Sequence, residues 1–265
     1  MSIKPSTSKG TRDFSSEEIV KRNYIKDKLQ KAFECYGFSP IETPTFERLD
    51  TLTGVYGDEG DRLVFKILNS GDKIRKADID AFSNGENKKF IYSISEKALR
   101  YDLTVPFARY VAQHQSKLIF PFRRYQIQPV WRADRPQHGR FQEFYQCDAD
   151  IVGDKSLWQE LEILSLYNKV FMDLKIEGVT MKVNHRKILA GVVSYLGAKS
   201  RLYDFTVILD KLDKIGKDGV FDELSHNNFS TKSIEKLQEI LDIKGTLLQK
   251  TEKLKKLFSS DKEGL

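Results

Sequence analysis

The chain has 265 residues, of which 40% are hydrophobic, 11% aromatic and 31% charged, and its formal net charge is +6. This apolar content excludes a disordered chain and suffices for one large domain, or for a core domain with a smaller one. The positive charge favours a polyanionic partner such as nucleic acid, although many mildly basic proteins have none.

The two cysteines, Cys35 and Cys147, are too few and too far apart for a zinc site or a disulfide framework. They fit a reducing compartment. The first residues, MSIKPSTSKG, lack the apolar region of a secretory signal, and no apolar run approaches the roughly 18 residues of a membrane span. We therefore expect a soluble, cytoplasmic protein that makes no membrane contact.

A long helix is predicted after a polar, extended lead-in over residues 1–14. It runs from about Ser16 to Tyr36. Ser15 or Ser16 is suited to the N-cap, and Gly37 to the position after the C-terminus, where left-handed backbone is common. Apolar residues recur at helical spacing and form one stripe: Ile25, Leu29, Ala32, Phe33 and Tyr36.

Extended structure is predicted for much of the segment that follows. FSPIETPTFE (38–47) contains Pro40 and Pro44, which exclude a helix and suit the edge of a sheet. A strand is expected in RLVFKILNSGD (62–72), and the polar stretch 73–88 predicts a loop.

KFIYSIS (89–95) is rich in β-branched and aromatic residues and predicts another strand. A helix is expected within RYDLTVPFARYVAQH (100–114). Thr104 is suited to its N-cap, and Pro106 is tolerated only in the first turn.

The stretch WRADRPQHGRFQEFYQCDAD (131–150) predicts two strands joined by a polar turn. Side chains alternate between the two faces of a strand. One face of the second strand is mostly apolar and suits a core. The opposite faces of the two strands hold Gln126, Gln128, Val130, Arg132, Phe144, Gln146, Asp148 and Asp150. Such a polar face is often simply solvated, so spacing alone leaves that interpretation open.

The second half of the chain is predicted to be mainly helical. A helix over about 155–174 has one apolar side, formed by Leu157, Leu161, Leu164, Tyr167, Phe171 and Leu174. A strand is expected at 179–185, with a short helix directly after it. From about residue 197 the sequence becomes Lys-rich and poor in strands, so we place a domain boundary between 1–196 and 197–265.

These elements together predict an α+β fold, with a mixed, mainly antiparallel sheet flanked by helices and a helical second domain. The strands and helices do not alternate regularly, which disfavours a doubly wound sheet.

Several common catalytic motifs are absent from the sequence. It contains no G-x-x-x-x-G-K-[ST] loop, no G-x-G-x-x-G after a strand, no H-E-x-x-H and no G-x-S-x-G. The four histidines, at positions 114, 138, 185 and 226, are too widely spaced to predict a metal site in protein side chains.

The polar strand face and its turn combine arginines, an aromatic residue and carboxylates. Arg132 and Arg140 are suited to phosphate oxygens because the guanidinium group is planar and rigid. Phe144 is suited to stacking on a base. A cationic, hydrogen-bonding small molecule suits Asp102, Gln146 and Asp150. The combination predicts a site that joins an amino acid to ATP.

Five segments in order carry a resemblance to a known family. They are GTRDF (10–14), GFSPIETPTFE (37–47), LRYDLTVPFARY (99–110), the 132–150 segment and VNHRKILAG (183–191). Together they resemble the histidyl-tRNA synthetases, which are class II aminoacyl-tRNA synthetases. LDKLDKIG (209–216) resembles the helical insertion of that family.

The resemblance implies a class II sheet, with ATP, histidine and tRNA-His as substrates and Mg²⁺ accompanying the ATP. The 37–47 segment is similar to motif 1, which implies a homodimer interface around Pro44. The two strands and their turn are similar to motif 2. By this similarity Arg132 is the catalytic residue, which contacts the α-phosphate and the histidine carboxylate.

The resemblance also implies the remaining ligands. In the ATP site, Asp134 reads the adenine amino group, Arg140 reaches the outer phosphates and Phe144 stacks on adenine. In the histidine site, the α-ammonium ligands are Asp102, Thr104 and Gln146, and Asp150 pairs with the imidazole.

Simpler interpretations of single residues stay open. Phe144 is more often a core residue than a stacking one, and Thr104 is also a helix cap. Asp148 is left unassigned because a solvated position explains it equally well. His138, in the turn, is a weak candidate for contact with tRNA, and the Lys-rich stretch 244–262 reads as a solvated helix face.

The family continues with segments that these residues do not match: an R-G-L-x-Y-Y motif, a Gly-rich motif 3 ending in arginine, and an anticodon-binding domain. We therefore expect a fragment of the enzyme, with little or no aminoacylation by itself. Two alternatives remain. One is a non-catalytic, synthetase-like regulatory subunit of histidine biosynthesis, and the other is a tRNA-sensing binding module.

Overall fold

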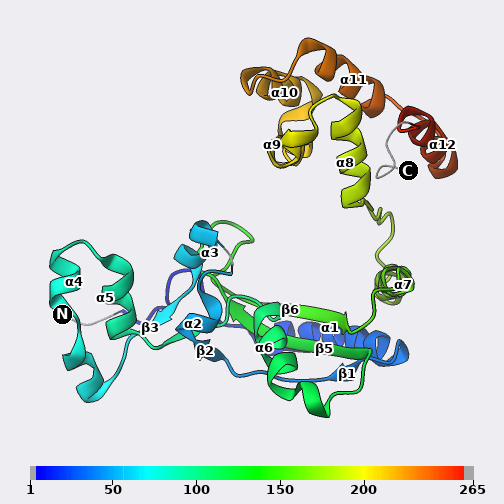
Figure 1. Ribbon diagram of the computed structural model, residues 1–265. Helices are drawn as coiled ribbons and strands as arrows, with labels where there is room; N and C mark the ends of the chain where they lie inside the picture. Colours follow the sequence, from blue (N-terminus) through cyan, green and yellow to red (C-terminus); the bar gives the residue numbers. More distant parts are fainter. Residues whose placement is uncertain (1–3, 56, 260–265) are drawn as a thin grey trace. The chain divides into compact units, whose positions relative to one another are not determined.

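The computed structural model describes residues 4–55 and 57–259, without the side chains of residues 58 and 59. The chain forms two compact units, Met1–Val179 and Thr180–Leu265. The first unit contains all the strands found in the described residues, and the second is helical (Figure 1).

A three-stranded sheet, in the order β1-β5-β6, forms the centre of the first unit. The long strands β5 (Phe122–Trp131) and β6 (Glu143–Val152) are antiparallel, and β1 (Ser39–Pro40) runs parallel to β5. This mixed, mainly antiparallel sheet confirms the predicted α+β fold. The turn between β5 and β6 lies within the segment expected to bind ATP.

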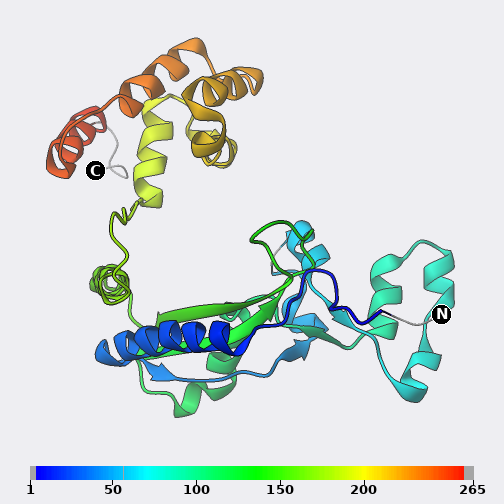
Figure 2. The ribbon, with the colours of Figure 1, turned by 180° about the vertical axis from the view of Figure 1, so that it is seen from behind.

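The apolar face of this sheet is covered by α1 (Ser16–Cys35) and α7 (Trp158–Asp173). Figures 1 and 2 show α1 lying along one face of the β5–β6 ribbon. Phe33 of α1 and Leu166 of α7 pack there with Tyr125 of β5. Ser15 caps α1 in a reciprocal capping box with Glu18, as expected for a Ser-x-x-Glu sequence.

A second, antiparallel sheet has the order β2-β4-β3. Its strands are short: β2 is Phe46–Arg48, β3 is Lys66–Ile67 and β4 is Lys97–Leu99. Around it lie α2 (Leu49–Leu52), α3 (Gly57–Leu63), the 3-10 helix η1 (Gly71–Lys76), α4 (Ile79–Ser83) and α5 (Asn87–Ile94). A small core of Leu49, Leu52, Val64 and Ala98 holds this region together.

Helix α6 (Thr104–His114), followed by the 3-10 helix η2 (Gln115–Lys117), lies on the polar face of the central sheet. The Phe107 ring of α6 lies 6.2 Å from that of Phe122 and 4.3 Å from the guanidinium carbon of Arg124, both in β5. The start of α6 is thereby placed against the strands that carry the expected site.

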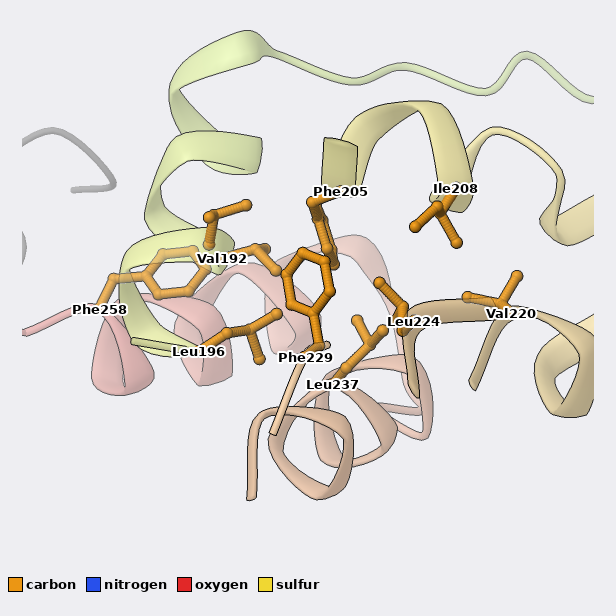
Figure 3. Packing of buried hydrophobic residues seen from close by; sticks show 10 residues of the cluster. Val192, Leu196, Phe205, Ile208, Val220, Leu224, Phe229, Leu237 and Phe258 are labelled. Carbon is orange, nitrogen blue, oxygen red and sulfur yellow. The ribbon is translucent and has the colours of Figure 1, made fainter. Parts of the chain in front are cut away.

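The second unit is built from α8 (Arg186–Tyr195), the 3-10 helix η3 (Lys199–Arg201), α9 (Leu202–Leu209), α10 (Leu212–His226), α11 (Thr231–Leu241) and α12 (Leu247–Leu257). Figure 3 shows its core, in which Phe205 and Leu237 are surrounded by side chains from the other helices. Helix α8 contributes Val192 and Val193 to this core. The compact units therefore divide between Val179 and Thr180, whereas the change in composition predicts a boundary near 197. That residues 197–265 are an insertion in a catalytic core stays a prediction.

Three local predictions are wrong, for residues 89–95, 73–88 and 179–185, and the strand predicted within 62–72 is shorter than expected. Residues 89–95 lie mostly in α5 rather than in a strand, because Ile91 packs from a helix onto the small core of the second sheet. Only Lys66–Ile67 is a strand within 62–72. The expected loop 73–88 contains most of η1 and the whole of α4, the latter capped by Asp78. Residues 179–185 form no strand, since nothing in the described chain pairs with them.

The apolar side predicted for the helix over 155–174 is also partly wrong. Leu157, Leu161 and Tyr167 are exposed. The residues of α7 that pack against the sheet are Ile163, Leu166 and Val170, and Leu174, directly after the helix, packs with them.

Candidate active site

The polar face of the β5–β6 ribbon is the floor of the candidate site. The register pairs Gln126 with Asp148, Gln128 with Gln146, and Val130 with Phe144. Because opposed residues in an antiparallel pair point to the same side, all of them share one face, as predicted. The opposite face carries Tyr125, Ile127 and Ala149 into the core.

Arg132 lies at the end of this floor between two aromatic rings. Its guanidinium carbon is 4.3 Å from the centre of the Tyr101 ring and 5.2 Å from that of Phe144. Its Nε donates a hydrogen bond to the carbonyl of Tyr101 at 3.2 Å, and its backbone amide donates to Gln142 at 2.9 Å. These contacts hold the guanidinium in one orientation before any substrate arrives.

The turn after Arg132 is closed by an ion pair between two residues expected to bind ATP. Both Nε and Nη2 of Arg140 donate to Asp134 Oδ2, at 3.1 and 2.9 Å. Asp134 is buried and Arg140 is exposed. Gln142 Nε2 donates to the carbonyl of Asp134 at 2.9 Å, which fixes the backbone of the turn.

Gly10, in the N-terminal GTRDF segment, is attached to this turn. The backbone amide of Gln142 donates to the Gly10 carbonyl at 2.8 Å. Gly10 has φ +80°, and a Cβ at this position would lie 2.7 Å from Gln142 Cγ. The close approach therefore requires a glycine, and it connects the first resembling segment to the expected ATP site.

The N-terminus of α6 meets the floor at Gln146. Gln146 Oε1 accepts a hydrogen bond from the backbone amide of Leu103 at 3.2 Å. Asp102 Oδ1 accepts from the amide of Val105 at 3.0 Å, so Asp102 caps the first turn. The predicted capping role of Thr104 is wrong, because Thr104 is the first residue of the helix itself and lies exposed.

A buried arginine lies at the other end of the floor. Arg124 is fully buried, pairs with the Asp150 carboxylate through Nη2, and donates to the carbonyl of Leu103 at 3.3 Å. Burial lowers the pKa of the Arg124 guanidinium, against the opposing effects of Asp150, Asp148 and Asp102.

The motif 1-like segment is held by a second buried arginine. Arg100 Nη1 donates to the carbonyls of Thr43 and Pro44, at 2.7 and 3.2 Å, and its Nε donates to that of Pro129 at 2.8 Å. Pro44 itself is exposed, and it is not among the residues gathered on the floor.

Most of the expected ligands therefore gather in one region. Arg132 and Phe144 contact each other, Asp134 and Arg140 close the adjoining turn, and Gln146 and Asp102 contact the start of α6. In the middle of the floor, burial raises the pKa of the Asp148 carboxyl. Arg124 and Arg132 lower this pKa, and Asp150 and Asp102 raise it further.

Arg100, Tyr101 and Arg124 have no expected role in the sequence analysis. The alternation that marks Gln126 and Gln128 continues backward by two residues to Arg124, so the period of the strand was a usable signal. Arg100 has no comparable local signal, since its partners are backbone carbonyls distant in sequence.

Two further findings concern metal ions and membranes. Within the described residues, no group of three or more His, Cys, Asp or Glu side chains is arranged to hold a metal ion. No helix in the same part of the chain combines the length and apolar character that crossing a membrane requires.

Comparisons with known proteins agree with the resemblance. A family model described as histidyl-tRNA synthetase matches residues 92–262. All of the chain aligns with proteins named histidine–tRNA ligase, at 58% identity for the one from Christiangramia forsetii and 54% for that from Flavobacterium johnsoniae. The chain spans 58% and 60% of the length of these two relatives.

Solved structures give the same answer for the fold. The crystal structure of histidyl-tRNA synthetase from Nostoc sp. PCC 7120 matches 99% of this chain and 55% of its own, with a TM-score of 0.80 and 27% identity. A Bacillus halodurans protein, described as an ATP phosphoribosyltransferase regulatory subunit/histidyl-tRNA synthetase, shares the fold at a TM-score of 0.75 and 22% identity, over 98% of this chain and 62% of its own. The chain belongs to the histidyl-tRNA synthetase family, and its sheet has the class II synthetase fold.

Proposed function

We propose that this chain supplies the ATP- and histidine-binding part of a histidine–tRNA ligase. The reaction joins histidine to ATP as histidyl-adenylate and transfers the histidyl group to the 3′ end of tRNA-His. The observation that carries the proposal is the placement of Arg132, which is bracketed by Tyr101 and Phe144 at the end of a polar floor.

Arg132 has a role that follows from the charges of the reactants. The histidine carboxylate attacks the α-phosphate, pyrophosphate leaves, and two anionic groups must approach each other. A guanidinium held in place lowers this repulsion and stabilises the charge that develops on the phosphate oxygens, an effect worth several kcal/mol in preorganised sites. Mg²⁺ is expected to arrive with the ATP phosphates.

The turn between β5 and β6 is the proposed ATP site. Arg140 would leave Asp134 to reach the outer phosphates, which frees the Asp134 carboxylate for the adenine amino group. Phe144 would offer its ring to adenine on the side not occupied by Arg132. These roles fit the exposure of Arg140 and the position of both residues in the turn beside Arg132.

The start of α6 is the proposed site of the histidine α-ammonium. Asp102 and Gln146 present oxygen atoms there, and Thr104, the first residue of α6, is exposed. The acidic end of the floor, at Asp150, would attract the imidazole. Selectivity for histidine would come from polar groups that other amino acids leave unpaired, which can reach about 10⁴-fold.

The partners beyond the small substrates follow from the family. Transfer requires tRNA-His, and the net charge of +6 is compatible with that polyanion. A homodimer through the motif 1-like segment fits the exposure of Pro44 and Phe46. A cytoplasmic location fits two free cysteines, Cys35 and Cys147, both exposed.

Histidine binding is the direct test of the site in this chain. We expect calorimetric titration with L-histidine to show saturable binding that competing L-lysine or L-leucine does not displace. Absence of any histidine binding would overturn the proposal.

Catalysis is tested in a chimera, because the chain spans 58% of its Christiangramia forsetii relative. The chain would be joined to the part of that ligase that it does not match and assayed for ATP–pyrophosphate exchange. We expect exchange that depends on histidine and falls by about 10²-fold or more in Arg132→Lys, which keeps the charge but loses the planar fork. The chain alone is expected to give little or no exchange. A folded chimera without histidine-dependent exchange would contradict a ligase and favour a regulatory, synthetase-like role.

A further inference from the structure

Tyr101 makes two separate contacts with the Arg132 side chain. The guanidinium carbon of Arg132 lies over the Tyr101 ring, 4.3 Å from its centre. Arg132 Nε also donates a hydrogen bond to the Tyr101 carbonyl at 3.2 Å. The ring limits the plane of the guanidinium and the carbonyl limits its rotation, so together they define the direction in which the outer nitrogens point.

The backbone that carries Tyr101 is held in place by the residue before it. Arg100 is only 1% exposed, and its guanidinium donates to the carbonyls of Thr43 and Pro129, at 2.7 and 2.8 Å. The Arg100 carbonyl accepts a hydrogen bond from the amide of Trp131, the residue before Arg132, at 3.1 Å. The backbone therefore also fixes Tyr101 beside the catalytic arginine.

The Tyr101 ring is supported by apolar packing. It packs against the small core of the second sheet, which is formed by Leu49, Leu52, Val64 and Ala98. These four side chains are buried, and none of them belongs to the polar floor that carries the expected ligands. A ring that rests on such a core offers the guanidinium a rigid surface, which ATP and histidine are not expected to disturb.

The second ring beside Arg132 is placed differently. The guanidinium carbon is 5.2 Å from the centre of the Phe144 ring. Phe144 is the residue proposed to stack on adenine, and it lies on the floor itself, in β6. When ATP binds, the Phe144 ring would be shared with the base, and Tyr101 would be the aromatic contact that Arg132 keeps unchanged.

We propose that Tyr101 is a positioning residue for the reaction, whose ring keeps the Arg132 guanidinium directed at the α-phosphate as the adenylate forms. The proposal rests on the proposed function and adds to it a residue that acts through Arg132 rather than on a substrate. Because charge develops on the phosphate oxygens in the transition state, a misdirected guanidinium would mainly slow the reaction and would change substrate affinity less. Loss of the ring should therefore change kcat rather than KM.

The ring contact can be tested separately from the backbone contact, because every variant keeps the carbonyl of residue 101. The test is ATP–pyrophosphate exchange in the chimera that tests the proposed function. Tyr101→Leu, which removes the ring, is expected to lower kcat by about tenfold and to change the KM values for ATP and histidine by less than about twofold. Tyr101→Phe, which keeps the ring, is expected to retain kcat within about twofold. Tyr101→Met provides a second variant without a ring should Tyr101→Leu not fold.

Ile91→Ala is the matched control for loss of packing. Ile91 of α5 packs against the same small core as Tyr101, whereas the rings that bracket Arg132 belong to Tyr101 and Phe144. This variant is expected to lower the thermal midpoint at least as much as Tyr101→Leu. Assayed well below both midpoints, it should keep kcat within about twofold of the unmodified chimera.

A spectroscopic readout on the chain itself tests the orientation of Arg132 directly. The ¹⁵Nε–H signal of Arg132 is assigned by its loss in Arg132→Lys, and its order parameter reports how far the guanidinium moves. We expect a value near that of rigid backbone, about 0.85, in the unmodified chain, in Tyr101→Phe and in Ile91→Ala, and a value below about 0.6 in Tyr101→Leu.

The outcomes separate this inference from the proposed function. If the unmodified chimera is active and Tyr101→Leu has the same kcat, the role of Tyr101 is wrong and the proposed function stands. The role is also wrong if Ile91→Ala loses as much kcat as Tyr101→Leu, since packing alone then explains the effect, or if Tyr101→Phe does, since the ring is then not what matters. If the unmodified chimera folds but shows no histidine-dependent exchange, the proposed function falls and this inference with it.

Discussion

Arg140 and Asp134, the two turn residues expected to contact opposite ends of ATP, are paired with each other at 2.9 Å. The pair closes the turn between β5 and β6. Gln142 also holds this turn, through a hydrogen bond to the Asp134 carbonyl. In the proposed site, ATP would therefore have to replace the partner of each residue, because neither residue is free. Because the Arg140 side chain is 56% exposed, opening the pair is expected to cost little, about 1 kcal/mol or less.

This arrangement predicts a measurable role for Arg140 in ATP affinity. Arg140→Ala should weaken ATP binding by about tenfold, because charge-assisted contacts to phosphate exceed the cost of opening an exposed pair. Arg135→Ala is the control, since Arg135 lies exposed in the same turn and has no ion pair among the described residues. ATP affinity is measured by calorimetry. If the two variants have equal affinities, Arg140 does not contribute to ATP binding.

Gly10 gives a second prediction, on the attachment of the N-terminal segment. Gly10→Ala should favour opening of this segment by about 2 kcal/mol, because the new Cβ meets Gln142 Cγ at 2.7 Å in addition to the unfavourable positive φ. The readout is hydrogen exchange of the Gln142 amide, which donates to the Gly10 carbonyl.

Gly139→Ala separates the two contributions. Gly139 has φ +75°, and no atom lies within 4 Å of the point that a Cβ would occupy there, so this variant should show only the backbone penalty of about 1 kcal/mol. If the Gln142 amide is as protected in Gly10→Ala as in the unmodified chain, the close approach of residue 10 to Gln142 does not require a glycine.

Features set by neighbouring residues were predictable from the sequence. The N-cap of α1, at Ser15, and the alternation of β5 and β6 are local, and both predictions are confirmed. The strand predicted at 89–95 is wrong because a short apolar run fits either structure, and packing of Ile91 against Leu49 and Ala98 decides it.

In the candidate site, too, local features were predictable and features that depend on tertiary contacts were not. Which side chains share the floor follows from a period of two, and so the face was predicted correctly. Which of them are free for a substrate depends on pairings across the sheet and the turn. The partnership of Arg124 with Asp150, and that of Arg140 with Asp134, require a register and a turn geometry that no local pattern specifies.

The raised pKa of Asp148 predicts how stability depends on pH. The folded chain binds this proton more tightly than the unfolded chain, in which an Asp titrates near pH 3.9. The contribution of Asp148 to the free energy of unfolding is therefore fully present below that value and is lost as the pH rises through the raised pKa.

Asp148→Asn has no carboxyl group at this position, so its stability does not fall in this way as the pH rises. The variant should have a higher thermal midpoint than the unmodified chain at neutral pH, and the difference should vanish below about pH 4. Thermal unfolding followed by circular dichroism at several pH values measures it. A midpoint for Asp148→Asn at or below that of the unmodified chain at pH 7 would mean that the carboxylate is satisfied in the free protein.

The second compact unit has its own core, which predicts that residues 180–265 fold when produced alone. Phe205 has no exposed surface and lies among side chains of several helices in that core (Figure 3). Phe205→Ala should lower the free energy of unfolding by about 3–5 kcal/mol, which is enough to unfold a unit of this size.

Tyr203→Ala is the control on the same helix, because Tyr203 is 81% exposed and its loss should change stability by about 0.5 kcal/mol or less. Urea unfolding followed by helical circular dichroism compares the two. A fragment 180–265 that shows no cooperative transition would mean that this core depends on the rest of the chain.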